Sequence, residues 1–185
     1  MAQSLKGPGY AVVRALLDRF EITLYPTHVE HVRFRRAHVA INGVPLIELV
    51  RSAEEPWARA EYLERLPEAE NPDEFKFEPG DYHYLSAAQL LLPSRELLDG
   101  PCDPGFVLDP DDPRRTKATV LGCTCGITQC WFLQVRVTLL PEVVVWSEFG
   151  QFHRPHWHYN LGPFTFDRKQ YEAQLASGVA PDPVV

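Results

Sequence analysis

Two strand-like runs in the last third of the chain, Trp131–Leu140 and Val143–Trp146, are separated by a two-residue Pro-Glu connection. Such a short connection joins antiparallel strands, so the residues before the first run and after the second meet at one end of a hairpin. Three cysteines precede the first run: Cys123, Cys125 and Cys130. Three histidines follow the second run: His153, His156 and His158. We therefore expect thiols and imidazoles to gather at one end of this hairpin.

The two runs of the hairpin are more apolar than a strand at the edge of a sheet. In the first run, every second residue from Trp131 to Leu139 is apolar, so one face of this strand is apolar. The second run, Val143–Trp146, is apolar at every position, which is typical of a strand covered on both faces. We therefore predict that the hairpin lies inside a sheet, since exposed edges rarely carry this much apolar surface.

The first part of the chain predicts further strands and a tight turn. Residues 20–25 alternate between apolar and polar side chains, which indicates a half-buried strand that Pro26 ends. A second strand is expected over Val32–Ile41. Its apolar residues change from even to odd positions, which predicts a bulge or a bend near residues 35–36. The Asn42-Gly43 dipeptide that follows is typical of a two-residue turn.

Several short helices are expected beside these strands. Apolar residues at helical spacing follow Pro45, and Pro56 is expected to end this helix. Further helices are predicted at residues 10–17, after a capping box at residues 86–89, and after Asp167. Together these elements predict an α+β fold.

The domain prediction is one α+β domain over residues 1–178, mainly an antiparallel sheet with several short helices. The stretch at residues 98–115 is rich in aspartate and proline and predicts a loop excursion. The last residues, 179–185, are expected to form a disordered tail.

The composition bears on partners and location. The net charge of −7 argues against non-specific binding to nucleic acid or to anionic membranes. Arg33, Arg35 and Arg36 form a local basic cluster, which we interpret as a solvated face of a strand. The first residues show neither a signal peptide nor a membrane span, so we expect a cytoplasmic protein with reduced thiols. The acidity suits a basic protein partner.

A set of residues in the C-terminal third resembles a family of uncharacterised bacterial proteins. The pattern comprises Gly122-Cys123-Thr-Cys125-Gly126, Cys130-Trp131, Trp146-Ser-Glu-Phe149, His153-Arg154, Phe164-Thr-Phe166-Asp167 and Tyr171. Upstream, Asn42-Gly43, Leu46 and Glu48-Leu49 are similar to the first half of that family. The resemblance implies a bacterial cytoplasmic protein of unknown function with a sheet-rich C-terminal half, and it implies no catalytic residue.

The three clustered cysteines are the strongest chemical signal in the chain. Thiolate and imidazole groups are the ligands that zinc prefers, and Cys123, Cys125 and Cys130 can converge on one ion if their turn folds back. His153 directly follows the second strand, so we predict it as the fourth ligand. Two other interpretations stay open: a reactive thiol, and a tight turn whose thiols pack as small apolar groups.

These observations leave two classes of function. The first is a non-catalytic binding or interaction module, with or without a structural zinc ion. The second is a small enzyme that depends on a metal or a thiol and uses the cluster of Cys123, Cys125, Cys130 and His153. The chain contains no phosphate-binding glycine loop and no G-x-S-x-G motif, so the first class is favoured and no catalytic residue is assigned.

Overall fold

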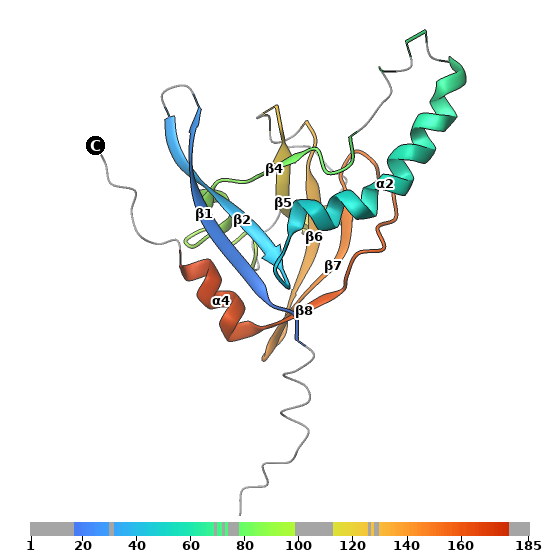
Figure 1. The fold of residues 1–185 in the computed structure, drawn as a ribbon. Coiled ribbons are helices and arrows are strands. Elements are labelled where there is room, and N and C mark those ends of the chain that lie inside the picture. Colours follow the sequence, from blue (N-terminus) through green and yellow to red (C-terminus); the bar gives the residue numbers. More distant parts are fainter. Residues whose placement is uncertain are drawn as a thin grey trace, which may run out of the picture.

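The computed structural model describes residues 17–29, 32–68, 70–71, 73, 78–98, 113–125, 127 and 130–177. It confirms the predicted α+β class, because two antiparallel sheets pack with helices around a shared core (Figure 1). A three-stranded sheet has the order β1-β2-β3, and a five-stranded sheet has the order β4-β5-β6-β7-β8. Within these residues, no helix has both the length and the apolar content that a membrane span needs.

The first sheet is built on a long hairpin of β1 (Phe20–Val29) and β2 (Val32–Ile41). Pairing runs without a shift from Phe20 opposite Ile41 to Val29 opposite Val32. The prediction that Pro26 ends the first strand is therefore wrong. Pro26 is tolerated because β1 is an edge strand, where a missing backbone N–H costs no ladder hydrogen bond.

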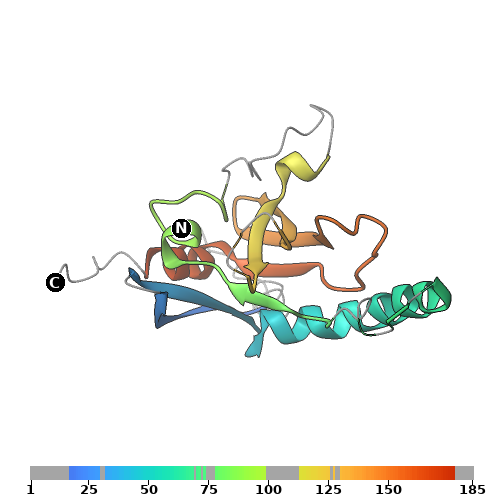
Figure 2. The same cartoon turned by 90° about the horizontal axis from the view of Figure 1, so that it is seen from above.

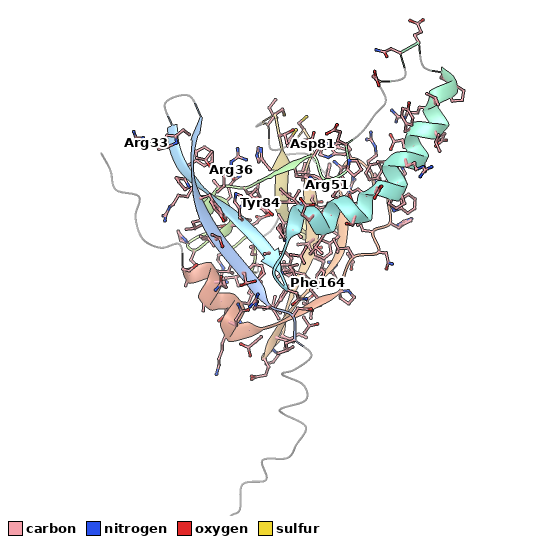
Figure 3. All side chains as sticks on the ribbon, in the orientation of Figure 1. Arg33, Arg36, Arg51, Asp81, Tyr84 and Phe164 are labelled. Carbon is pink, nitrogen blue, oxygen red and sulfur yellow. The ribbon has the colours of Figure 1, made fainter. Side chains whose placement is uncertain are left out.

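The predicted bulge in β2 is also absent from this uninterrupted pairing. Odd-numbered residues such as Ala37 and Val39 are buried, and Phe34 stays half-buried on the opposite face. The Arg36 guanidinium lies 5.7 Å from the centre of the Phe34 ring and covers it. That face also carries His38, whose ring stacks on Tyr84 with centroids 4.1 Å apart. Figure 3 labels Arg36 and Tyr84 in this part of the molecule. Neighbouring side chains thus cover Phe34 on the face of the even-numbered residues, and the strand keeps the same buried face along its length.

The predicted turn after β2 is confirmed, because Asn42 and Gly43 both have positive φ angles, 55° and 80°. This conformation suits a two-residue hairpin turn. It leads into β3 (Val44–Pro45) and then into α2 (Leu46–Arg65), which a 3₁₀ turn at Leu66–Glu68 extends.

Helix α2 continues through Pro56, so the prediction that this proline ends the helix is wrong. A proline in a helix interior removes one hydrogen bond and costs about 3 kcal/mol. Contacts beyond it offset this cost: the Trp57 indole donates to the His158 carbonyl at 2.9 Å, and Glu61 pairs with Arg154 at 2.9 Å. Figure 2 shows that the second half of α2 extends well beyond the sheets.

The second sheet contains the predicted C-terminal hairpin. Its strands are β4 (Tyr82–Tyr84), β5 (Ala118–Cys123), β6 (Leu133–Leu139), β7 (Val143–Gln151) and β8 (Phe164–Asp167). The prediction that the hairpin lies inside the sheet is confirmed, because β6 and β7 each have a neighbour on both sides.

The short helices follow their predicted caps. A capping box of Ser86 and Gln89 opens α3 (Ala87–Leu90). The Asp167 carboxylate caps α4 (Arg168–Ala176) by accepting the Gln170 N–H at 2.9 Å. A 3₁₀ turn at Pro113–Thr116 precedes β5. The predicted helix at residues 10–17, most of the loop excursion at 98–115 and the tail at 179–185 lie outside the described residues.

An aromatic core joins the two sheets to α4. Phe20 of β1 lies 5.2 Å from Trp146 of β7 and 4.5 Å from Tyr171 of α4, measured between ring centres. The Trp146 indole donates to the Tyr171 hydroxyl, which in turn donates to the Leu97 carbonyl at 2.7 Å. The backbone of Asp18 also pairs with that of Phe166, so the start of β1 is attached to β8. These contacts hold β1, β7, β8 and α4 together.

Candidate functional site

The three predicted cysteines lie together where β5 ends and β6 is about to begin. Their sulfur atoms all lie within 4.8 Å of one another. Cys123 is the last residue of β5 and is buried, whereas Cys125 and Cys130 are exposed. The Cys125 backbone N–H donates to the Cys123 sulfur at 3.5 Å, which holds the turn closed over the end of the strand. A cluster of three thiols this close together can hold a metal ion.

The environment of these thiols separates their acidities. Burial raises the pKa of Cys123 to about 11. A hydrogen bond from Cys123 lowers the pKa of Cys125, which is exposed to solvent. Cys125 is therefore the better nucleophile of the two when no metal is present, since the thiolate is the reactive form. A bound cation would favour the thiolate at every position and release protons as it binds.

The hairpin brings His153 to the same end of the sheet, as expected, but not into the thiol cluster. The Phe152 N–H donates to the Phe132 carbonyl at 3.1 Å, which extends the pairing of β6 and β7 toward the cysteines. The His153 ring packs edge-on against Phe132 and Phe152, at 5.6 and 5.1 Å between centres. Among the described residues, the metal-ligating group within 4.8 Å comprises the three sulfurs alone. The role of His153 as fourth ligand stays a prediction.

The other two histidines lie on the loop that leads from β7 to β8. His156 is exposed. The His158 ring meets Trp57 edge-on at 5.8 Å, and its side chain lines a cavity beside β7. Neither residue belongs to the thiol cluster.

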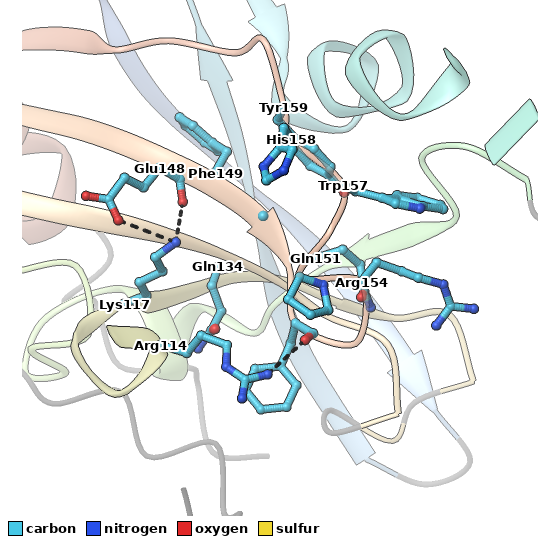
Figure 4. A pocket seen from close by; sticks show the side chains of 13 residues that line it. Arg114, Lys117, Gln134, Glu148, Phe149, Gln151, Arg154, Trp157, His158 and Tyr159 are labelled. Carbon is cyan, nitrogen blue, oxygen red and sulfur yellow. Dashed lines mark hydrogen bonds and ion pairs between the residues drawn. The ribbon is translucent and has the colours of Figure 1, made fainter. Parts of the chain in front are cut away.

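This cavity, which the sequence did not suggest, has a volume of about 550 Å³ (Figure 4). Aromatic and polar side chains line it together, among them Phe149, Trp157, Arg114, Lys117, Glu148 and Gln151. None of the three clustered cysteines is among the lining residues. The cavity and the thiol cluster are therefore separate sites.

A bulge in β7 shapes the wall of this cavity. Ser147 lies opposite Arg136, but Gly150 lies opposite Gln134, so two residues of β7, 148 and 149, face a single residue of β6. Glu148 has a positive φ of 52°, which is uncommon for a residue with a side chain and marks local strain. The extra residue moves the buried side of the strand from even to odd positions, so that Phe149 and Gln151 face inward.

Ion pairs hold the strained residue in place. The Arg136 guanidinium binds the Glu148 carboxylate at 2.7 Å, and the Lys117 ammonium donates to the Glu148 carbonyl at 2.8 Å. The hydrogen bond from Arg136 is the largest cause of the lowered pKa of Glu148. Burial is the largest cause of the lowered pKa of Lys117.

A second polar network without a sequence signal lies beneath α2. The Glu54 carboxylate is only 1% exposed and accepts hydrogen bonds from the hydroxyls of Tyr82 and Tyr159 and from the Gly80 N–H. Burial raises the pKa of Glu54. On the helical pattern alone, Glu54 is indistinguishable from the exposed acidic residues of the same helix.

Comparison of the chain with protein-family models, curated proteins and solved structures finds no match. The resemblance to a family of uncharacterised bacterial proteins therefore stays a prediction, and the functional argument rests on the sites themselves.

Proposed function

We propose that this protein is a non-catalytic binding module in which Cys123, Cys125 and Cys130 hold a zinc ion. The observation that carries the proposal is the convergence of three sulfur atoms within 4.8 Å. Sulfur ligands at about 2.3 Å from a zinc ion lie about 3.8 Å apart in a tetrahedron, so only a small contraction of the turn is needed. Zinc would join the end of β5 to the segment before β6.

The position of the cluster favours a structural or interaction role over catalysis. A catalytic zinc ion keeps an open coordination position inside a shaped cavity. Here Cys125 and Cys130 are exposed, and the thiols do not line the 550 Å³ cavity. The fourth position is open to His153, after movement of its ring, or to a group from a partner. The net charge of −7 suits a basic protein as that partner.

Metal analysis of the purified protein tests this proposal. We expect one zinc ion per chain and three thiols that become titratable only after chelation. Cys130→Ser should lose the zinc. Cys102→Ser is the control, because the proposal gives this cysteine no role, and the variant should keep the metal. Protein that carries no zinc and does not bind added zinc would contradict the proposal.

A second candidate is a thiol-dependent enzyme, which the exposure and lowered pKa of Cys125 favour. In that case the metal-free protein reacts rapidly at Cys125 with electrophiles, and added zinc does not alter the rate. The same metal analysis therefore separates the two candidates.

A further inference from the structure

The thiol cluster contains one sulfur that is fixed in the sheet and two that are not. Cys123 is the buried last residue of β5, where it is paired with β4. The hydroxyl of its neighbour Thr124 donates to the Asp81 carboxylate at 3.3 Å, which also attaches this residue to the segment before β4. Cys125 and Cys130 are exposed and lie outside both β5 and β6. A reagent from solvent therefore reaches these two sulfurs first.

Cys125 and Cys130 are also the pair that can form a disulfide with the least disturbance of the sheet. Their sulfur atoms lie within 4.8 Å of each other, so a small movement of the turn can bring them to bonding distance. Both residues lie in turns, and the Cys130 N–H donates to the Ile127 carbonyl at 3.2 Å. A disulfide from Cys123 would instead displace a buried residue that strand pairing holds in place.

We propose that Cys125 and Cys130 form a peroxide-sensitive switch, in which their oxidation to a disulfide releases the zinc ion. The switch rests on the zinc site proposed above, because it regulates that site. Zinc binds deprotonated sulfur, and an oxidised pair offers none. Of the three cysteines only Cys123 is then left as a ligand, so the ion dissociates. The turn is no longer joined to the end of β5, and its exposed Ile127 side chain can move with it.

The reaction uses one molecule of hydrogen peroxide per chain and proceeds in two steps. One thiolate of the pair attacks a peroxide oxygen: an S–O bond forms, the O–O bond breaks, hydroxide leaves, and the sulfur becomes a sulfenic acid. The other thiolate attacks this sulfur: the S–S bond forms, the S–O bond breaks, and a second hydroxide leaves. Protons from solvent convert both hydroxides to water. The two sulfurs together lose two electrons, which reduce the peroxide.

Zinc release from loaded wild-type protein tests the switch. Zinc content is measured first, and a chain that binds no zinc overturns the zinc site and the switch with it. One equivalent of hydrogen peroxide should then release about one zinc ion per chain to a coloured chelator, while the mass of the protein falls by two hydrogens. A thiol reductant with fresh zinc should restore the loaded form. Zinc that stays bound in excess peroxide would overturn the switch alone and leave the zinc site standing.

Peptide mapping of metal-free variants after peroxide treatment identifies the oxidised pair. Wild type and Cys123→Ser should form the disulfide between Cys125 and Cys130 at similar rates. Cys125→Ser should form a disulfide about tenfold more slowly, because the remaining pair includes the buried Cys123. Cys102→Ser is the control, because the switch gives this thiol no role, and its loaded form should release zinc as the wild type does. A wild-type disulfide that includes Cys123 or Cys102 would overturn the assignment.

Discussion

The hydroxyl of Tyr82 in β4 donates a 2.5 Å hydrogen bond to the carboxylate of Glu54 in the middle of α2. The Tyr159 hydroxyl donates to the same oxygen, and the Gly80 N–H donates to the other oxygen at 2.7 Å. None of these three partners carries a positive charge. The carboxylate is therefore held by hydrogen bonds alone in a buried position, which is why burial dominates its raised pKa.

This raised pKa predicts a dependence of stability on pH. The folded protein binds the Glu54 proton more tightly than the unfolded chain does. The contribution of Glu54 to the free energy of unfolding is therefore largest below its ordinary pKa of 4.5 and falls as the pH rises through the folded-state pKa. Glu54→Gln resembles the protonated form at every pH. The free energy of unfolding of the wild type minus that of the variant should fall toward neutral pH, by at most about 1.4 kcal/mol per pH unit.

Urea unfolding of both proteins at several pH values from 4.5 upward measures this difference. Glu55→Gln is the control, because it removes an exposed carboxylate from the same helix. If the free energy of unfolding of the wild type minus that of Glu54→Gln rises with pH, the predicted role of the raised Glu54 pKa is wrong.

Pro56→Ala should stabilise the protein. The proline is exposed within α2 and removes a helical hydrogen bond, so alanine should raise the free energy of unfolding by about 1–3 kcal/mol. Thermal unfolding followed by circular dichroism checks this, with Glu64→Ala as an exposed control in the same helix. A lower melting temperature would mean that the proline aligns the contacts of Trp57 and Glu61 with the loop after β7.

Val144→Asp should be among the most damaging substitutions in the second sheet. Val144 is fully buried between Leu139 of β6 and Phe166 of β8, so a charge there has no partner and should cost about 4 kcal/mol or more. Val145 lies on the opposite face and is half-buried between threonines. Val145→Asp should therefore cost clearly less, and equal losses in urea unfolding would contradict the assigned faces.

The fold was largely predictable because its strongest elements have local signals. The Asn42-Gly43 turn, the cap at Asp167 and the apolar second strand of the hairpin each depend on neighbouring residues alone. The predictions that Pro26 and Pro56 end their elements were wrong because tertiary contacts, which the local sequence does not show, allow each proline inside its element. One lies in an edge strand, and the other lies in a helix whose second half is held by the loop after β7.

The sites were predictable only in part for the same reason. The cysteines are close in sequence, so their convergence followed from one turn. Gln151 lines a cavity because a bulge at Glu148 inverts the faces of β7, and no residue pattern marks that bulge. His153 follows its strand as expected, but the aromatic rings of Phe132 and Phe152 take up its side chain. Such packing depends on residues from the whole core and produces no periodic pattern in the sequence.

Alkylation of the cysteines should report zinc binding residue by residue. In the metal-free protein, the exposed Cys125 and Cys130 should react with iodoacetamide before the buried Cys123. Zinc should slow labelling at all three positions together, because ligation occupies each sulfur. Peptide mass spectrometry after timed quenching measures each site. Cys102, to which the three-thiol site gives no role, is the internal reference whose labelling should not change with zinc. If Cys125 and Cys130 are slowed while Cys123 is not, the ion does not reach the end of β5, and the three-thiol site is wrong.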